Sequence, residues 1–467
     1  MGGGRRSRAT VSMGGEYLVL RPERATVLDL IAMLLSSMID ARKSVDSSKR
    51  TEPSFARRFV IFVSVLVQKI LLFVACPMSS CGSALEMCLN TLSLNGGLRG
   101  LLFKIFWGKV AIPDRTSRAF LSVNGNLDPR VDLDSNIIPG DGRYNGAVAI
   151  MASKAAYENK AYIETAVADH WKMKFVDSYD FWNDCVDQFT TRAFVMHNPN
   201  SNPETIIVSF RGTRPFDAYE WCSDFDISWY EIPGVGRVHA GFMEALGMQK
   251  KGGLPKELEQ EKKQLPVAYY FLRKELKELL QEKEGAKFVV TGHSLGGALA
   301  ILFPAILAVH KEEWLLERLE GVYTFGQPRV GDEQFALFVT GKLKEYGVKY
   351  NRYVYCNDMV PRLPADDSAL LFKHFGTCLY FNSLYQGKIC ETAPNRNYFS
   401  PLALISMILN AVWEIIRSFF ISIILGPNYR EGWFLRFYRM SGLLIPGLPD
   451  HAPQDYDNST RLAVLPF

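Results

Sequence analysis

Short apolar runs alternate with amphipathic stretches through the middle of the chain. Runs at 190–197, 205–210, 287–290, 321–325, 348–355 and 372–381 have the length and the β-branched or aromatic content of buried strands. Helices are predicted between them at 240–248, 265–282, 298–309 and 332–344. Strands that alternate with helices predict an α/β fold with a mostly parallel central sheet.

Two longer apolar stretches precede this region. Residues 59–76 are almost wholly apolar, and a second stretch covers 85–107, after the breaker-rich segment 77–82. Gln68 and Lys69 interrupt the first stretch, which is shorter than the roughly 20 apolar residues of a spanning helix. We therefore predict two helical arms, broken at 77–82, that enter a lipid surface from one side. The alternative is a helical subdomain packed on the core.

A third apolar stretch, 401–425, predicts a helix with one narrow polar stripe. Its polar residues recur at steps of three or four: Ser406, Asn410, Glu414, Arg417, Ser418 and Ser422. Such a helix lies in an interface, packs against the N-terminal apolar arms, or pairs with a second copy of itself to form a homo-oligomer. The sequence does not choose among these. Glu414 and Arg417 are spaced to neutralise each other.

Composition limits the function classes. With 467 residues, of which 48% are hydrophobic, the chain has enough for one large domain and an appendage. A net charge of only +4 argues against a nucleic-acid partner. The eight cysteines have neither metal-ligand spacing nor the density of a disulfide scaffold, so we expect reduced thiols, no metal and no cofactor. The first thirty residues lack the apolar core of a secretory signal.

The strongest chemical signal is a Gly-x-Ser-x-Gly pattern between a predicted strand and a predicted helix. It reads Gly292-His293-Ser294-Leu295-Gly296. In such a nucleophile elbow the serine takes a strained turn, and the two glycines let the backbone pass closely on either side. Ser294 is therefore the predicted nucleophile. The N–H of Leu295, at the start of the helix, is a predicted donor to an oxyanion.

A serine nucleophile needs a histidine that takes its proton and a carboxylate that fixes the histidine tautomer. Asp358 follows a predicted strand two strands after the elbow, where α/β-hydrolases have their acid, and Asp366 and Asp367 are weaker candidates. Only His374 and His451 lie downstream of Asp358. We prefer His451, because the base belongs on a loop after the last strand and His374 falls in a predicted strand.

The second oxyanion donor is expected in the turn after the strand at 205–210. There we predict that the Thr213 N–H lies opposite that of Leu295. The next segment, 214–230, mixes aromatic with acidic residues, which is typical of an amphipathic lid. The lid candidates are Phe216, Tyr219, Trp221, Phe225 and Trp229. The alternative is a surface helix whose apolar face packs on the core.

Five motifs, in this order, resemble the class 3 (fungal-type) lipase family. They are Phe210-Arg211-Gly212-Thr213, Val238-His239-Ala240-Gly241-Phe242, the elbow, Thr324-Phe325-Gly326-Gln327-Pro328-Arg329-Val330-Gly331 and Asn357-Asp358-Met359-Val360-Pro361-Arg362-Leu363-Pro364. The resemblance implies an α/β-hydrolase fold, a Ser294–Asp358–His451 triad and an oxyanion hole at Thr213 and Leu295. The segments 16–22 and 453–462 are similar, more narrowly, to plant oil-body triacylglycerol lipases.

The resemblance implies an enzyme that hydrolyses triacylglycerols through an acyl-enzyme at the cytosolic face of the lipid-droplet surface, with the endoplasmic reticulum membrane as a further location. A phospholipase A1 or galactolipase of the same family is one alternative, and a catalytically silent lipase-like scaffold is the other. The expected regions are an N-terminal part with an apolar anchor (1–139), a catalytic core (140–398), an inserted helical element (399–440) and a C-terminal segment that carries His451 (441–467). We expect the insertion, once docked on lipid, to help place His451.

Overall fold

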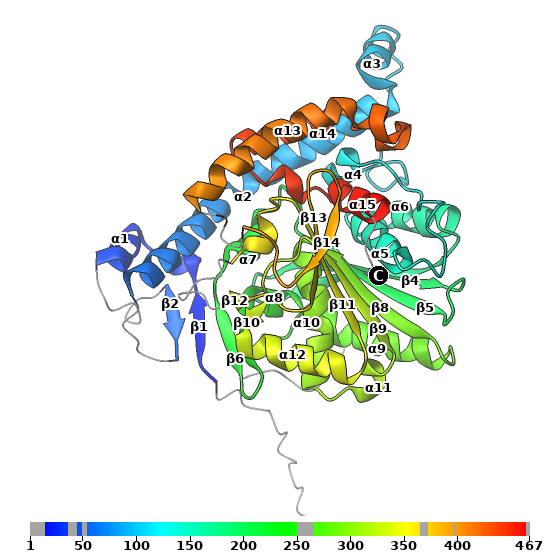
Figure 1. Cartoon of the computed structure of the whole chain (residues 1–467). Helices are drawn as coiled ribbons and strands as arrows, with labels where there is room; N and C mark the ends of the chain where they lie inside the picture. The colour runs from blue at the N-terminus through cyan, green and yellow to red at the C-terminus, as the bar shows by residue number, and fades with distance from the viewer. Residues whose placement is uncertain are drawn as a thin grey trace, which may run out of the picture.

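The computed structural model describes residues 15–35, 44–48, 54–249, 265–364, 372–395, 398 and 400–463. Its centre is an eight-stranded sheet with the order β14-β13-β11-β9-β8-β5-β4-β3 (Figure 1). Five neighbouring strands are parallel: β5 (Thr205–Phe210), β8 (Lys287–His293), β9 (Leu319–Phe325), β11 (Lys349–Tyr355) and β13 (Thr377–Phe381). Antiparallel strands complete both edges: β3 (Lys174–Asn183), β4 (Gln188–Asn198) and β14 (Gly387–Cys390). The expected mostly parallel sheet is confirmed.

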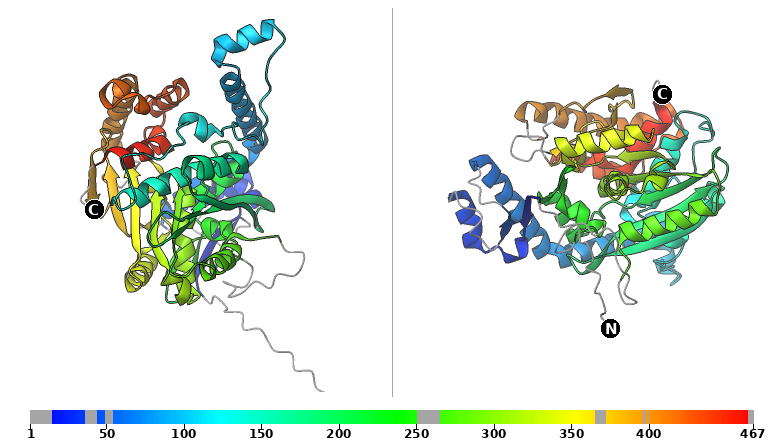
Figure 2. Two further views of the ribbon diagram at one scale, coloured as in Figure 1. Left: turned by 90° about the vertical axis from the view of Figure 1, so that its right-hand side faces the viewer. Right: turned by 90° about the horizontal axis from the view of Figure 1, so that it is seen from below.

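Helices cover both faces of this sheet (Figures 1 and 2). On one face lie α8 (Ala240–Ala245), α9 (Ala268–Gln281), α10 (Leu295–Val309) and α12 (Glu333–Glu345). On the other lie α5 (Tyr144–Ala155), α6 (Lys160–Thr165) and α15 (Pro453–Leu462). Because α10 is apolar around its whole circumference, it is buried almost completely, and it fixes the helical side of the elbow. The structure also has four shorter helices: α1 (Val27–Leu35), α4 (Val123–Leu127), α7 (Ala218–Phe225) and α11 (Glu313–Leu316).

A second, smaller sheet is antiparallel throughout and has the order β12-β10-β7-β6-β1-β2. Its strands are β1 (Tyr17–Leu20), β2 (Val45–Ser47), β6 (Trp229–Ile232), β7 (Gly236–His239), β10 (Gly331–Asp332) and β12 (Phe372–Lys373). The single strand predicted at 372–381 is therefore wrong, because it is divided between the two sheets. Gly376, with φ +77°, turns the chain between β12 and β13.

The N-terminal apolar region forms one long helix, α2 (Phe55–Leu94), followed by α3 (Gly97–Phe106). The break predicted at 77–82 is wrong, because α2 continues through Pro77, which lies on its exposed side. The chain turns instead at Gly96 and Gly97, whose φ values of +80° and +74° cannot continue an α-helix. Figure 2 shows α3 projecting well away from the rest of the molecule.

The inserted element consists of α13 (Pro401–Leu425) and α14 (Trp433–Met440). The central part of the polar stripe of α13 faces inward: Glu414, Arg417 and Ser418 are buried, whereas Ser406 and most of the apolar circumference are exposed. The charge of Glu414 helps to raise the pKa of Arg417, as its spacing predicted, but the direct ion pairs of these residues are with Arg439 of α14 and Asp455 of α15. Among the described residues, α2 and the span 403–425 of α13 are both long and apolar enough to cross a membrane, by length and composition alone.

A buried ionic cluster attaches the insertion to the core. Arg439 of α14 is only 1% exposed, and its guanidinium binds carboxylates from three other places in the chain. The Arg439 cluster comprises the ion pairs with Glu431 (2.6 Å), Glu414 (2.9 Å) and Asp455 (3.0 Å), and that between Arg417 and Asp455 (3.2 Å). Since these carboxylates come from α13, the α13–α14 connection and α15, the cluster fixes the insertion against α15.

Replacing Arg439 with Met would leave three buried carboxylates with a single remaining counter-ion, Arg417. We expect the free energy of unfolding to fall by about 3–5 kcal/mol, measured by urea denaturation, because breaking a buried ion pair leaves an uncompensated charge. The matched control is Lys274→Met, which removes an exposed ion pair with Glu278 on α9. That change is expected to cost less than about 0.5 kcal/mol. Equal effects from the two substitutions would contradict a structural role for the cluster.

Candidate active site

Ser294 occupies the turn between β8 and α10 in a conformation that non-glycine residues rarely adopt, with φ +59° and ψ −131°. Its N–H donates to the carbonyl oxygen of Phe325 at 2.8 Å, which ties the turn to the end of β9. A strained serine at the strand-to-helix turn is the geometry of a nucleophile elbow. The side chain is covered in this structure, because Ser294 is only 4% exposed.

The two glycines of the elbow are required by close backbone contacts. A Cβ on Gly292 would lie 2.2 Å from the carbonyl carbon of Gly296, and one on Gly296 would lie 2.3 Å from the carbonyl oxygen of Phe210. A Cβ on Gly212 would lie 2.5 Å from the carbonyl oxygen of His293. The end of β5 therefore passes directly beside the serine.

Asp358 lies just beyond the end of β11 and is fully buried. Its Oδ1 accepts from the Val360 N–H at 2.9 Å. Its Oδ2 accepts from the Nδ1–H of His451 at 2.7 Å and from the hydroxyl of Tyr456 at 2.5 Å. Three donors hold this carboxylate in one orientation, and one of them is the predicted base.

His451 ends a short 3-10 helix, Pro449–His451, that leads into α15. With Nδ1 bound to Asp358, the remaining ring nitrogen is Nε2, which is buried and has no hydrogen-bond partner among the described residues. The structure thus brings Asp358 and His451 together. Within the described part of the chain, Ser294 and His451 share no hydrogen bond.

His293, the residue before the nucleophile, connects the elbow to the loop of the base. Burial and the nearby His451 hold the pKa of His293 well below its usual range, so the ring is neutral. Its Nε2–H donates to the carbonyl oxygen of His451 at 2.9 Å, and its Nδ1 accepts from the hydroxyl of Tyr157 at 2.9 Å. The two imidazole rings lie 4.5 Å apart between centroids. His293 therefore holds the backbone of His451 beside Ser294.

The other acid and base candidates do not join this group. His374 donates from Nε2 to the carbonyl oxygen of Pro361 at 2.6 Å, and burial together with Arg352 lowers its pKa well below the usual range. Asp366 and Asp367 lie outside the described residues.

Thr213 is buried in the turn after β5, and Leu295 is the first residue of α10, where backbone N–H groups lack acceptors within the helix. The Thr213 hydroxyl donates to Oδ2 of Asp224, in α7, at 2.6 Å. Burial, aided by the charge of Glu220, raises the pKa of Asp224 to about 7. Sequence analysis did not single out Asp224. It was one of several acidic residues in the predicted lid segment and had no motif of its own.

The lid candidates divide between two elements. Tyr219, Trp221 and Phe225 lie in α7, and Phe216 lies just before it. Trp229 is not part of this helix: it lies in β6, with the guanidinium of Arg237 over its ring at 4.2 Å. Trp229 is therefore not a lid residue, because its strand pairs with a neighbouring strand of the small sheet on each side.

The helix α7 is fastened at the oxyanion turn. The buried Glu220 carboxylate accepts hydrogen bonds from Nη2 of Arg211 at 2.7 Å and from the backbone N–H of Arg214 at 2.7 Å. These arginines flank Gly212 and Thr213. Any displacement of α7 therefore acts directly on the turn that carries Thr213.

The opposite side of α7 packs on α2, and this contact explains the polar residues in that apolar helix. Ser64 Oγ donates to the carbonyl oxygen of Phe225 at 2.8 Å, at the C-terminal end of α7 where carbonyls lack helical partners. The side-chain amide of Gln68 donates to Ser64 Oγ at 3.1 Å, and its backbone carbonyl oxygen accepts from the thiol of Cys222 at 3.7 Å. Gly82 contacts Phe216 so closely that a Cβ would lie 2.4 Å from that of Phe216.

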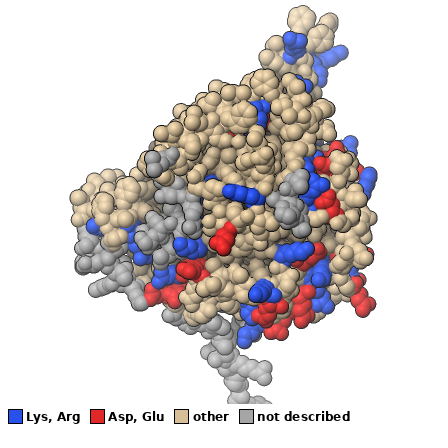
Figure 3. All heavy atoms as spheres, viewed as in Figure 1, with Lys and Arg blue, Asp and Glu red and all other residues tan. Residues whose placement is uncertain are grey.

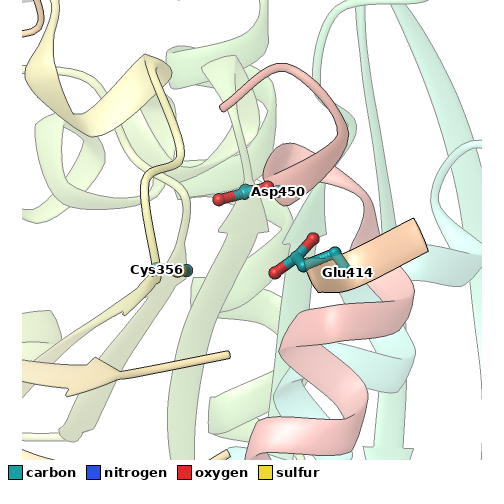
Figure 4. Close-up of side chains that lie close together, drawn as sticks. All are labelled: Cys356, Glu414 and Asp450. Carbon is teal, nitrogen blue, oxygen red and sulfur yellow. The ribbon is translucent and has the colours of Figure 1, made fainter. Parts of the chain in front are cut away.

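Among the described residues, one group has the composition of a metal site: Cys356, Glu414 and Asp450, whose potential ligand atoms all lie within 4.8 Å of one another (Figure 4). Both carboxylate oxygens of Glu414 already accept hydrogen bonds, from the Tyr355 hydroxyl at 2.8 Å and from Arg439 at 2.9 Å. Burial and the two neighbouring carboxyl groups raise the pKa of the Cys356 thiol well above its usual range. Because both oxygens of Glu414 are already engaged by protein donors, we assign no metal to this group.

The model of the class 3 lipase family matches residues 207–368. The triacylglycerol lipase OBL1 of Arabidopsis thaliana is 41% identical over 96% of this chain and 94% of that protein. The chain belongs to the class 3 lipase family. The triacylglycerol lipase OBL1 of Nicotiana tabacum is 42% identical over 87% of this chain and 83% of that protein. Among solved structures, lipase II from Rhizopus niveus is 24% identical over 56% of this chain and 88% of that chain, with a TM-score of 0.40.

Family membership confirms the resemblance seen in the sequence motifs. Together with the central sheet, it confirms the α/β-hydrolase fold, and it confirms that this class 3 lipase is a serine ester hydrolase.

Substituting Gly326, in the turn after β9, tests how closely the base must fit. A Cβ there would lie 2.8 Å from Cε1 of His451 and 2.9 Å from Oδ2 of Asp358, at a φ of +60°. We expect Gly326→Ala to lower turnover of a soluble ester about 100-fold, because a small displacement of a reacting group has that effect. The matched control is Gly341→Ala in α12, where a Cβ meets no atom within 4 Å. Normal turnover in the Gly326 variant would contradict this placement of the base.

Proposed function

We propose that this class 3 lipase hydrolyses triacylglycerols with Ser294 as nucleophile, His451 as general base and Asp358 as the acid that orients the base. The observation that carries the proposal is the 2.7 Å hydrogen bond from His451 to the buried Asp358, beside a serine on a strained elbow. Ordered Ser, Asp and His residues with this geometry support acyl transfer.

The reaction follows from these positions. Nε2 of His451 takes the proton of the Ser294 hydroxyl as Oγ attacks the acyl carbonyl carbon, and Asp358 stabilises the imidazolium. The N–H groups of Thr213 and Leu295 donate to the oxyanion. His451 then returns its proton to the leaving glyceride oxygen, and the ester bond to glycerol breaks. A water molecule hydrolyses the acyl-enzyme by the same steps, releasing the fatty acid.

Two considerations favour a neutral glycerolipid as the substrate. Two relatives that are named triacylglycerol lipases match 96% and 87% of this chain. The side of the molecule that carries α2 and α13 is almost free of charged side chains, whereas charges of both signs gather over the opposite side (Figure 3). A phospholipase A1 or galactolipase activity is the competing outcome of the experiment below.

We infer that this uncharged side docks on the surface of a lipid droplet, with the catalytic core in the cytosol. Large apolar side chains on α2, α13 and α14 face outward, among them Phe73 (87% exposed), Ile423 (78%) and Trp433 (64%). Apolar faces of this extent are typical of lipid contact. Ser64 and Gln68 lie near the middle of the apolar stretch of α2 and bind α7, so this part of α2 stays against the protein. We therefore infer that α2 enters the monolayer from one side and does not cross it. The cytosolic leaflet of the endoplasmic reticulum offers the same chemistry.

We also propose that α7 is a lid. Ser294 is covered in this structure, so an element must move before a triacylglycerol can reach it. The helix contacts Thr213 on one side and α2 on the other, which supports a movement coupled to lipid contact of α2.

The first experiment compares products from triolein, phosphatidylcholine and galactolipid, together with fluorophosphonate labelling. We expect fatty acid release chiefly from triolein, and labelling that Ser294→Ala abolishes along with at least about 10⁴-fold of the activity. Ser209→Ala, a buried serine in β5, is the control that should keep both. Absence of Ser294-dependent labelling would indicate a silent scaffold, and preference for a polar lipid would overturn the substrate assignment.

The lid proposal predicts that bridging α2 to α7 stops lipolysis. Gln68→Cys introduces a thiol at the residue whose backbone carbonyl oxygen accepts from the native Cys222 thiol, and dibromobimane can join the two thiols. We expect the bridged enzyme to lose about tenfold or more of its activity on emulsified triolein, because α7 can no longer move. The Gln68→Cys/Cys222→Ser variant, treated identically, controls for reaction at other cysteines. Full turnover by enzyme shown to be bridged by mass spectrometry would eliminate the lid.

A further inference from the structure

Asp450 is a buried carboxyl group to which the proposed mechanism gives no role. It directly precedes His451 and is 2% exposed. Figure 4 shows it close to Cys356, which directly follows β11, and to Glu414 of α13. Since burying a carboxyl group is unfavourable unless its contacts compensate, these contacts indicate what the residue does.

On one side, Asp450 binds the loop of the catalytic acid. Its Oδ2 accepts from the N–H of Asn357 at 2.9 Å, and Asn357 directly precedes Asp358. One hydrogen bond therefore joins the neighbours of the two triad members, which are 93 positions apart in the chain. A second tie lies beside it, where the N–H of Met359 donates to the carbonyl oxygen of Gly447 at 3.3 Å.

On the other side, Asp450 faces Glu414 of α13, within the group whose potential ligand atoms all lie within 4.8 Å. Glu414 belongs to the Arg439 cluster, so it is fixed from α14 and α15. Asp455 of that cluster directly precedes Tyr456, whose hydroxyl binds Asp358. The insertion is thus connected to the acid–base pair of the triad through two residues. Asp450 bonds to the neighbour of Asp358, and Asp455 precedes Tyr456, which binds Asp358.

The surroundings of Asp450 favour its neutral form. Burial and the charge of Glu414 raise its pKa well above the usual range. A neutral carboxyl group accepts the Asn357 hydrogen bond without placing another negative charge beside Glu414. An asparagine side chain has the same shape and keeps the accepting oxygen.

We propose that Asp450 is a positioning residue of this lipase: through its hydrogen bond to Asn357 it holds the loops of His451 and Asp358 in register, and it seats both loops against Glu414 of the insertion. It acts as an uncharged hydrogen-bond acceptor. This inference rests on the proposed triad.

The test compares Asp450→Asn with Asp450→Ala in the full-length enzyme, using a soluble short-chain ester and rates divided by the number of fluorophosphonate-labelled sites. We expect Asp450→Ala to lower kcat about 10- to 100-fold with little change in KM, because the loops lose register while substrate contacts remain. Asp450→Asn is expected to keep kcat within about threefold of the unsubstituted enzyme.

The matched control is Asp332→Ala, in the small sheet and outside the loops of Asp358 and His451. Asp332 caps α12 and accepts the Phe335 N–H at 2.9 Å, so its loss removes a similar contact between carboxyl and backbone. It should lower thermal stability while leaving kcat per labelled site unchanged.

Two results would overturn the proposal. Unchanged kcat per labelled site in Asp450→Ala would mean that the residue serves folding alone. A loss in Asp450→Asn equal to that in Asp450→Ala would mean that the charged carboxylate is required. If the unsubstituted enzyme were not labelled at Ser294, the proposed triad itself would fail, which is a distinct outcome.

Discussion

The hydrogen bond between Asp358 and His451 is the contact on which the rest of this lipase depends. It joins side chains 93 positions apart, and the whole insertion lies between them in the chain. A long connection makes such a contact entropically costly, so it persists only where other contacts hold both ends. His293 holds the backbone of His451, Tyr456 holds the carboxylate of Asp358, and Asp450 joins the two loops. The proposed acid–base pair is therefore the meeting point of β11, α15 and the insertion.

The insertion has the polarity of a membrane-facing element. Glu414, Arg417 and Arg439 are buried while most of its large apolar side chains are exposed, which reverses the usual arrangement of a surface helix in water. The arrangement is stable because Glu414 and Arg417 meet opposite charges from α14 and α15 away from solvent. The same helix thus presents a lipid-compatible surface on one side and borders the triad loops on the other. A similar division applies to α2, whose buried Ser64 and Gln68 serve α7.

Where the sequence analysis succeeded, the pattern was local or ordered along the chain. The elbow around Ser294 was found from its glycines, and the structure places Asp358 and His451 in contact as their order predicted. Where it failed, a distant partner decided the outcome. The break predicted at 77–82 is a separate failure, since α2 continues through Pro77, which is on its exposed side. Asp224, Tyr456 and Asp450 had no motif of their own, since their contacts come from segments brought together only by folding.

By itself, the sequence determined the family, the alternation of strands and helices, the strained nucleophile turn and the presence of a polar stripe on α13. These features depend on backbone sterics and on the spacing of side chains within one element. Only the tertiary structure decided that the central part of the stripe faces inward, that Glu414 and Arg417 take other partners, that α7 lies between the oxyanion turn and α2, and that one carboxyl group joins the two triad loops. Those outcomes depend on which buried charges and donors meet across the core, because an unpaired polar group is costly there and no single segment supplies both partners.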